Sequence, residues 1–247
     1  LGIIKEGEIK DHVQFVEALR RLRGKILGAR SGSKRMVNAA VSLSSLGIYS
    51  QVFTLPLVGG ENLERAVQLN LQMASPSELS ENYSGWQVVG EDKEAVRLEI
   101  LSAFASRAAV DALVKDLRDA GFLSATLESG AISLVRLLRD GAVGFDRKKS
   151  YAMVHLKTSG IDFLIVRNGF LYFEYFVSWR DVQSNEREIP LVVFQNALIR
   201  NMRQVLNFYG QHWQDPLEEV FVLAGNLNED VSKTIKENFP LNPRELV

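Results

Sequence analysis

The chain has 247 residues, of which 46% are hydrophobic and 24% charged, and its formal net charge is −1. This balance is typical of a globular protein of one or two domains, and the near-zero charge gives no general attraction to nucleic acid. Cysteine is absent, which excludes disulfide bonds, a thiolate nucleophile and Cys-based metal sites, and fits a reducing, cytoplasmic setting. No apolar run approaches the roughly 18 residues of a membrane-spanning helix, so we expect membrane association only through a surface or a partner.

Basic residues are concentrated near the start of the chain. Residues 18–60 contain seven basic side chains and no acid, whereas residues 61–130 contain twelve acids and six bases. The seven are Arg20, Arg21, Arg23, Lys25, Arg30, Lys34 and Arg35. This run is either the solvated face of a helix with the loop after it, or a contact surface for anionic lipid headgroups or an acidic partner.

The first part of the chain predicts two helices and two strands. Apolar residues at near-helical spacing indicate an amphipathic helix over residues 11–27, with Asp11 as its N-cap and Gly28 as its stop. The elements predicted after it are strand 36–43, strand 52–58 and helix 62–74.

Strand 52–58 and helix 62–74 begin an α+β unit. Its further elements, in order, are strands 85–89 and 96–106 joined as a hairpin by a charged turn at 90–93, then helix 109–120 and strand 122–127. A helix at 130–139 returns to the first layer. We therefore predict an inserted unit at about residues 52–126, within a first domain of residues 1–145.

A second domain is predicted over residues 150–247. The polar stretch before it contains Arg147-Lys148-Lys149 and reads as the boundary. The Asn168-Gly169 pair predicts a tight hairpin turn between two strands. The predicted elements are strands 152–156, 163–167 and 170–179, helix 191–213, strand 219–224 and helix 229–238.

Two patterns that could carry chemistry are weak. Residues 28–35, GARSGSKR, look like a phosphate-binding loop, but three residues instead of four separate the glycines and Ser33 comes between Gly32 and Lys34. The stretch also lies between a helix and a strand, the reverse of the required order, so we expect a surface loop. The histidines His12, His155 and His212 fall in unrelated elements, so no metal site is predicted.

Residues 50–83 carry the most specific signal. They read SQVFTLPLVGGENLERAVQLNLQMASPSELSENY, a strand, a helix and a Ser-Pro turn, and Trp86-Gln87-Val88-Val89 follows as the next strand. This order resembles the PilM family of type IV pilus assembly and its GspL-type relatives in type II secretion. These families are actin-like proteins on the cytoplasmic face of the inner membrane.

The resemblance implies an α/β, actin-like (ribonuclease H-like) fold of two halves, with the inserted α+β subdomain in the first half and a reduced second half. Only ten residues separate Trp179 from Pro190, where the family usually carries a helical subdomain that walls the adenine pocket. This shortening is similar to the GspL-type proteins. The opening LGIIKEGEIKD resembles the family's second or third strand and the turn after it, which implies a piece upstream of Leu1.

The family's nucleotide pocket is degenerate here. Aligning Val166-Arg167-Asn168-Gly169 with the family's strand end and turn puts His155 at the Asp, and Lys157 at the Gly, of its Asp-x-Gly pattern. Gly225 alone remains of a late Gly-rich loop. Glu128 stands where an acidic residue often lies near the nucleotide, although it also suits a helix N-terminus. We expect ATP and Mg²⁺ to be lost as cofactors and no catalytic residue, with a remodelled anion site as the alternative.

Partner binding is the use that the resemblance favours. The family takes the short N-terminal cytoplasmic peptide of PilN, a membrane protein, into a groove between the first layer and the inserted unit. An extended apolar peptide needs a strand edge or a cleft with alternating pockets. The candidates for partner binding are Phe53, Leu55, Leu57, Met73 and Trp86, each of which also suits a core.

We therefore predict a cytoplasmic scaffold, peripheral to the inner membrane, in a pilus or related secretion assembly. It would be a pseudo-ATPase that binds a PilN-like peptide and no nucleic acid. Membrane contact would be indirect or through the basic region 18–35, and self-association is left open. Two alternatives stay open: an active ATPase whose phosphate-binding strand precedes Leu1, and an unrelated α/β binding module.

Overall fold

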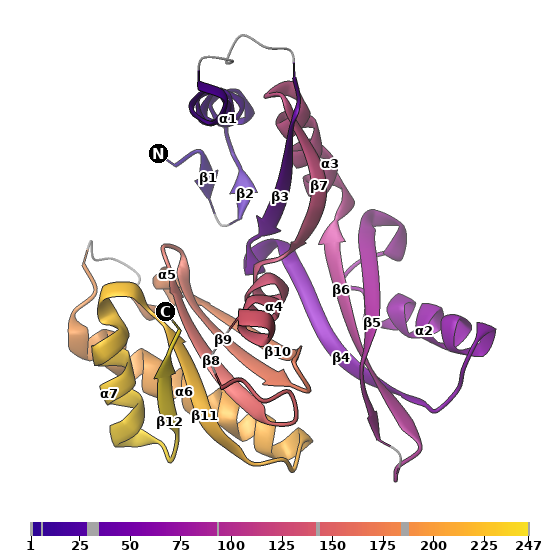
Figure 1. Ribbon diagram of the computed structural model, residues 1–247, viewed down its shortest axis with the longest axis vertical. Helices are drawn as coiled ribbons and strands as arrows, with labels where there is room; N and C mark the ends of the chain where they lie inside the picture. Colours follow the sequence, from indigo (N-terminus) through magenta and orange to yellow (C-terminus); the bar gives the residue numbers. More distant parts are fainter. Residues whose placement is uncertain are drawn as a thin grey trace. The chain divides into compact units, whose positions relative to one another are not determined.

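The computed structural model describes residues 2–5, 7–28, 35–92, 94–141, 144–183 and 188–246. The chain divides into two compact units (Figure 1). Unit 1 comprises Leu1–Ser50, Leu57–Gln87 and Ser102–Ser133, and unit 2 comprises Gln51–Pro56, Val88–Leu101 and Leu134–Val247. Each unit is described by itself below.

Unit 1 is built on two parallel strands. Strand β3 (Val37–Leu43) pairs with β7 (Phe122–Ser129), with Val37 opposite Phe122. Helix α3 (Arg107–Asp119) connects back to β7, and helix α1 (His12–Leu27) precedes β3. A short antiparallel hairpin of β1 (Ile4–Lys5) and β2 (Glu8–Ile9) opens the unit.

The core of unit 1 lies between this pair of strands and the two helices. Because strand side chains alternate between faces, β3 turns its apolar side chains Val37, Ala39 and Val41 to one face. On that face they pack against the buried cluster of Leu117, Ala120 and Phe122. Helix α1 adds Val16 and Leu19, and α3 adds Leu113.

A second sheet has three strands. Its order is β4 (Ile48–Pro56), β6 (Arg97–Ser106) and β5 (Asn82–Asp92), and residues of these strands fall in both units. Helix α2 (Glu61–Ala74) lies between β4 and β5 in sequence and buries Val67 and Leu71.

Unit 2 contains a mixed five-stranded sheet in the order β10-β9-β8-β11-β12. The first three strands form an antiparallel meander, and β11 is parallel to both β8 and β12. The strands are β8 (Ser150–Lys157), β9 (Gly160–Arg167), β10 (Phe170–Ser178), β11 (Leu217–Leu223) and β12 (Asn242–Glu245). The helices are α4 (Gly130–Gly141, which starts in unit 1), α5 (Trp179–Val182), α6 (Leu191–His212) and α7 (Asn228–Asn238). The short 3₁₀ turns of the chain are η2 (Ser45–Gly47), η3 (Leu79–Glu81) and η4 (Gly225–Leu227).

Strand β9 is the centre of the unit 2 core. Its residues from Gly160 to Val166 are all buried, as expected for a strand covered on both faces. Helix α6 packs against β9 and α7, and buries one side from Phe194 to Tyr209. Within the described residues, no helix is long and apolar enough to cross a membrane.

Most predicted elements are confirmed. Asp11 caps α1 and Gly28 ends it, and Asn168 and Gly169 take the positive φ angles, +54° and +75°, of a tight hairpin turn. The predicted charged turn at 90–93 is wrong, because β5 continues to Asp92. The turn comes later, where Asp92 Oδ1 accepts a hydrogen bond from the Ala95 amide and Val96 has a φ of +51°. Strand β12 was not predicted.

The side chain of Asp11 stabilises the start of α1. Asp11 Oδ1 accepts a hydrogen bond of 2.9 Å from the Gln14 amide, one of the helix N–H groups that has no partner inside the helix. We expect Asp11→Ala to lower the free energy of unfolding by about 1 kcal/mol. Urea denaturation of the purified chain measures it, and Asp11→Ser is the control that should retain the stability. Equal midpoints for all three proteins would contradict the assignment.

Candidate functional site

Unit 1 contains an apolar cavity of about 560 Å³. Four elements surround it: the β1–β2 hairpin, the first turns of α1, the end of β3 and the first half of α3. The lining side chains are mainly aliphatic or aromatic, including Ile4, Ile9, Phe15, Val41, Leu43, Val110 and Leu113. Its composition suits an apolar ligand or peptide better than a phosphate.

Small residues on α3 leave this space open. The helix presents Ala108, Ala109 and Ala112 to the cavity, and their side chains end at Cβ. The position of the helix is fixed at its start, where Ser106 Oγ accepts a hydrogen bond from the Ala109 amide. A larger side chain on this face of α3 would therefore fill the cavity rather than be accommodated by a shift of the helix start.

The cavity includes a strand with a free edge. β3 pairs with β7 along one edge, and no strand among the described residues pairs with its other edge. Val41, Ser42 and Leu43 at the end of β3 line the cavity. An unpaired edge presents backbone N–H and C=O groups, which an added extended peptide can use.

A buried acid contacts one of the residues that line the cavity. Asp116 of α3 is only 4% exposed, and its Oδ2 lies 2.6 Å from Nδ1 of His12 on α1. His12 also lines the cavity. The contact joins α1 to α3 and gives the buried carboxylate a polar partner, as an acid in such a position requires.

The residues predicted to bind a partner are exposed to different degrees. Leu57, Met73 and Trp86 belong to unit 1 and are 43%, 76% and 40% exposed. Phe53 and Leu55 belong to unit 2, where Phe53 is half-buried and Leu55 is buried. None of the five lines the apolar cavity of unit 1. That they bind a partner stays a prediction.

His155 and Lys157, predicted to stand at the degenerate nucleotide site, both face one buried acid. Asp162 on β9 is 1% exposed and lies opposite His155 on β8. Its Oδ2 forms an ion pair with Lys157 Nζ and lies 3.7 Å from His155 Nδ1. Lys157 Nζ also lies 5.8 Å from the ring centroid of Phe176. The ammonium therefore already has an anionic partner.

The other two predicted nucleotide-site residues lie elsewhere. Gly225 begins η4 in unit 2 with a φ of +57°, a backbone conformation that favours glycine, although a Cβ at this position would meet no atom within 4 Å. Glu128 lies in β7 of unit 1 and is half-buried. Among the described residues, no group of three or more His, Asp or Glu side chains is placed to hold a metal ion.

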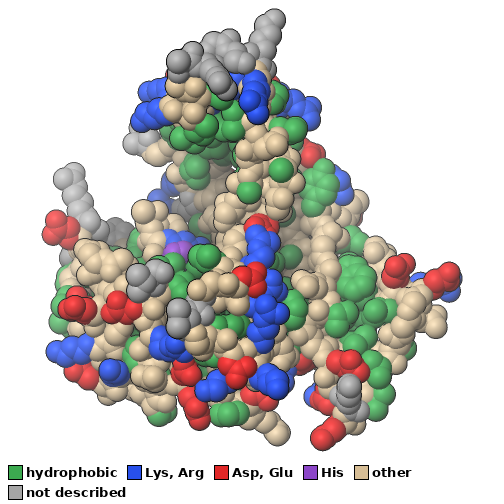
Figure 2. Space-filling model, viewed as in Figure 1, with side chains coloured by type: hydrophobic (Ala, Val, Ile, Leu, Met, Phe, Trp, Pro, Cys, Tyr) green, Lys and Arg blue, Asp and Glu red, His purple; other side chains and the backbone are tan. Residues whose placement is uncertain are grey.

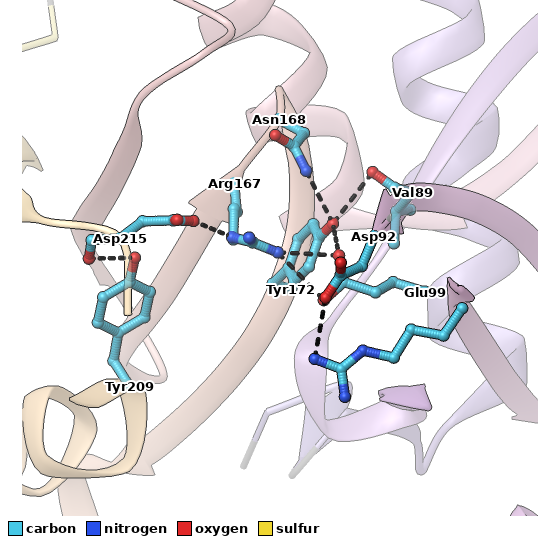
Figure 3. Close-up of polar contacts among 9 residues, drawn as sticks. Val89, Asp92, Glu99, Arg167, Asn168, Tyr172, Tyr209 and Asp215 are labelled. Atoms are coloured by element: carbon cyan, nitrogen blue, oxygen red, sulfur yellow. Dashed lines mark hydrogen bonds and ion pairs between the residues drawn. The ribbon is translucent and has the colours of Figure 1, made fainter. Parts of the chain in front are cut away.

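A network of charged and polar side chains lies in unit 2 (Figure 3). Arg167, at the end of β9, donates from Nη1 to both oxygens of Glu99 at 3.1 and 2.8 Å, and from Nε to Asp215. Glu99 lies on β6 and is 8% exposed. The contacts therefore tie the β5–β6 hairpin to the end of the β9–β10 hairpin and to the loop before β11.

Tyr172 completes the network. Its hydroxyl lies 2.8 Å from Glu99 Oε2 and 3.1 Å from the carbonyl oxygen of Val89, and accepts a hydrogen bond from Asn168. Burial, followed by the charge of Glu99, raises the pKa of Tyr172 well above its usual range. The pKa of Arg167 is also raised, because the effects of Asp215 and Glu99 exceed the opposing effect of burial. Both groups therefore keep their protons at neutral pH.

The network requires glycine at position 90. A Cβ at Gly90 would overlap Glu99 Oε2 and the Tyr172 hydroxyl oxygen. The absence of a side chain therefore lets the acid and the phenol approach the backbone of β5.

Sequence reasoning missed the cavity and the charged network. The cavity depends on alanines that read only as good helix formers. The network joins Glu99 to Arg167 and Tyr172, which are 68 and 73 positions away in the sequence. Strands β6 and β9 did carry a partial signal of buried ion pairs in their sequences. Glu99 and Asp162 are acids inside the otherwise apolar runs LEILSAF and GIDFLIV. An acid in such a run predicts a buried pair.

The chain matches no protein-family model and no curated protein in sequence. In structure it is similar to a chain of the PilM-PilN type IV pilus biogenesis complex, with a TM-score of 0.72 and 14% identity, over 98% of this chain and 78% of that one. The cytoplasmic domain of EpsL, an inner-membrane component of the type II secretion system of Vibrio cholerae, matches at 0.48 and 11% identity, over 94% and 75%. The ethanolamine utilization protein EutJ from Carboxydothermus hydrogenoformans also matches at 0.48 and 11%, over 99% and 73%.

At 14% identity, the first likeness shows the fold. The predicted fold class, α/β and actin-like, is confirmed.

Removing the central cation tests the charged network. Arg167→Met leaves Glu99 buried without its ionic partner, so we expect the free energy of unfolding to fall by about 3–5 kcal/mol. Adding Glu99→Gln should recover part of this loss, because the amide still accepts a hydrogen bond from Tyr172 without a buried charge. Urea denaturation measures the free energy of unfolding of the unmodified chain, the single variant and the double variant. The control is Lys115→Met at the exposed Lys115–Asp119 pair, which should change this free energy little. Equal effects of Arg167→Met and Lys115→Met would refute a structural role for the network.

Proposed function

We propose, from its PilM-like, actin-like fold, that this chain is a scaffold of a type IV pilus or related secretion assembly. It would bind the cytoplasmic peptide of a membrane-anchored, PilN-like partner. The observation that carries the proposal is the likeness, over 98% of the chain, to a protein solved as a PilM-PilN complex. On this proposal the protein works on the cytoplasmic face of the inner membrane, peripheral to it.

The apolar cavity of unit 1 is our choice for the peptide site. Its volume, its aliphatic lining and the free edge of β3 together suit an extended peptide with apolar side chains. Backbone pairing with β3 would supply affinity, and the pockets beside Phe15 and Leu113 would select side chains. The five residues proposed from sequence, Phe53, Leu55, Leu57, Met73 and Trp86, form the competing assignment.

The nucleotide site is proposed to be degenerate, which would make the protein a pseudo-ATPase. The support is the pairing of Lys157 with Asp162. A phosphate arriving at this place would compete with a buried carboxylate for the same ammonium and would be repelled by that carboxylate. His155, beside the same acid, offers neither the carboxylate nor the open backbone of an Asp-x-Gly strand.

Peptide binding separates the two assignments of the partner site. The probe is a fluorescein-labelled peptide with the cytoplasmic N-terminal sequence of the PilN-like protein from the same genome, titrated by fluorescence anisotropy. We expect Ala109→Trp to fill the cavity and weaken binding at least tenfold. Ala125→Trp, at an exposed position of β7 outside the cavity, is the matched control that should bind as the unmodified chain does.

The outcomes are distinct. Full affinity in Ala109→Trp together with a loss in the Leu57→Ala, Trp86→Ala double variant would move the site to the residues proposed from sequence. No binding of the peptide to the unmodified chain would refute the proposed function itself.

Nucleotide binding tests the other half of the proposal. We expect isothermal titration of this chain with MgATP to give no binding heat, because Lys157 is already paired. Asp162→Asn, which releases the ammonium, should increase any residual affinity for ATP. Micromolar binding to the unmodified chain, or to a version extended upstream of Leu1 in its gene, would instead favour an active ATPase.

A further inference from the structure

One end of unit 1 combines exposed aliphatic side chains with cations. We define the tip surface as the aliphatic residues Leu22, Ile26, Met36 and Leu123 with the basic residues Arg21, Lys25 and Arg35. The four aliphatic side chains are 49%, 57%, 39% and 48% exposed. The three basic residues are exposed as well. Figure 2 shows hydrophobic side chains between Lys and Arg side chains at this end of unit 1, at the top of the view.

Contacts in the structure bring these residues to the same end. Arg23, in the last two turns of α1, donates from Nη2 to the carbonyl oxygen of Arg35 at 2.6 Å. The side chain of Arg23 also lies against Gly121, where a Cβ would come within 2.7 Å of its Nε. The end of α1, the start of β3 and the start of β7 therefore meet at Arg23.

The aliphatic side chains of the tip surface are not part of the unit 1 core. The core uses the face of β3 and β7 that carries Val37 and Phe122, whereas Leu123 points to the opposite face. On α1, Val16 and Leu19 enter the core and Leu22 and Ile26 do not. Folding of unit 1 thus gives no reason for these four aliphatic residues to be exposed together.

The charge of the tip surface is one-sided. Every charged residue described between Ala18 and Met36 is basic. Asp119 lies near this surface: its carboxylate pairs with Lys115, and its backbone oxygen accepts a hydrogen bond from Arg20. Cations around a helix C-terminus also interact favourably with the helix dipole. That effect explains Lys25 but not the exposed Leu22 and Ile26 beside it.

We propose that the tip surface docks on an anionic lipid bilayer. Aliphatic side chains framed by Lys and Arg are the composition of interfacial membrane contacts, where the apolar groups enter the headgroup boundary and the cations meet lipid phosphates. Single-stranded nucleic acid would also match the charge, but its binding sites use aromatic side chains for base stacking. The tip surface as defined contains no aromatic residue. The proposal is independent of the proposed peptide site.

Vesicle flotation tests this proposal with the unmodified chain. The probes are vesicles of phosphatidylcholine alone and of phosphatidylcholine mixed with phosphatidylglycerol, an anionic lipid that makes the vesicle surface negative. We expect flotation only with the anionic vesicles, and weaker flotation at high salt because screening removes the electrostatic part. No binding to anionic vesicles at low salt, or equal binding to both vesicle types, would overturn the proposal.

Variants separate the two contributions. Arg21→Gln with Lys25→Gln should weaken partitioning by about 25-fold, roughly fivefold for each cation. Leu22→Ser with Ile26→Ser leaves the charge unchanged and should also weaken it. The matched control is Arg65→Gln with Lys233→Gln, exposed cations on α2 and α7, which should float as the unmodified chain does.

The remaining outcomes also decide the matter. Equal loss in the control and in the Arg21, Lys25 variant would show a general charge effect and overturn the proposal. The proposal would also be overturned if the Leu22, Ile26 variant bound vesicles fully and single-stranded DNA displaced the chain from them. Those two results together would indicate a general site for polyanions. Circular dichroism confirms that each variant is folded.

Discussion

The burial of one carboxylate, that of Glu99, constrains how the β5–β6 hairpin packs in unit 2. A charge at 8% exposure is stable only with ionic and hydrogen-bonding partners, and Glu99 obtains both from the β9–β10 hairpin. The β5–β6 hairpin therefore cannot separate from the five-stranded sheet without exposing Arg167 and Tyr172. Apolar packing makes unit 2 compact, and this network ties the β5–β6 hairpin to the end of the β9–β10 hairpin.

The two units use polar groups in different ways. In unit 2, buried acids are neutralised by neighbouring cations, Glu99 by Arg167 and Asp162 by Lys157. In unit 1, the notable features are open: a cavity, a free strand edge and an exposed aliphatic surface. This division is consistent with the proposed function, in which the chain acts by presenting surfaces to partners and does no chemistry on a nucleotide.

Local signals in the sequence predicted local structure well. The N-cap at Asp11, the stop at Gly28 and the Asn168-Gly169 turn each depend on residues within a few positions of one another. The hairpin turn after β5 was placed too early because the charged residues Glu91 and Asp92 suit a turn, yet Asp92 ends the strand and caps the turn beyond it. Strand β12 contains Pro243 and Arg244, which disfavour a strand by composition, and it forms because β11 offers a parallel edge.

The candidate sites were harder to predict, for physical reasons. A cavity is defined by side chains that are missing, so the alanines of α3 gave no positive signal. Leu57 and Met73 were chosen as apolar residues near a junction, but a sequence pattern does not separate an exposed apolar residue from a core one. The basic run before residue 36 was visible in the sequence. Its exposed aliphatic neighbours became apparent only once the core of unit 1 was defined.

Gly90 links three positions that are otherwise distant in sequence. Because its missing side chain is the space that Glu99 and Tyr172 occupy, a side chain at position 90 fits only with smaller side chains at positions 99 and 172. Alanine at 90 would require a shorter acid at 99 and the loss of the hydroxyl at 172. Among homologous chains we therefore expect residues 90, 99 and 172 to covary, so that this part of unit 2 evolves as a group rather than position by position.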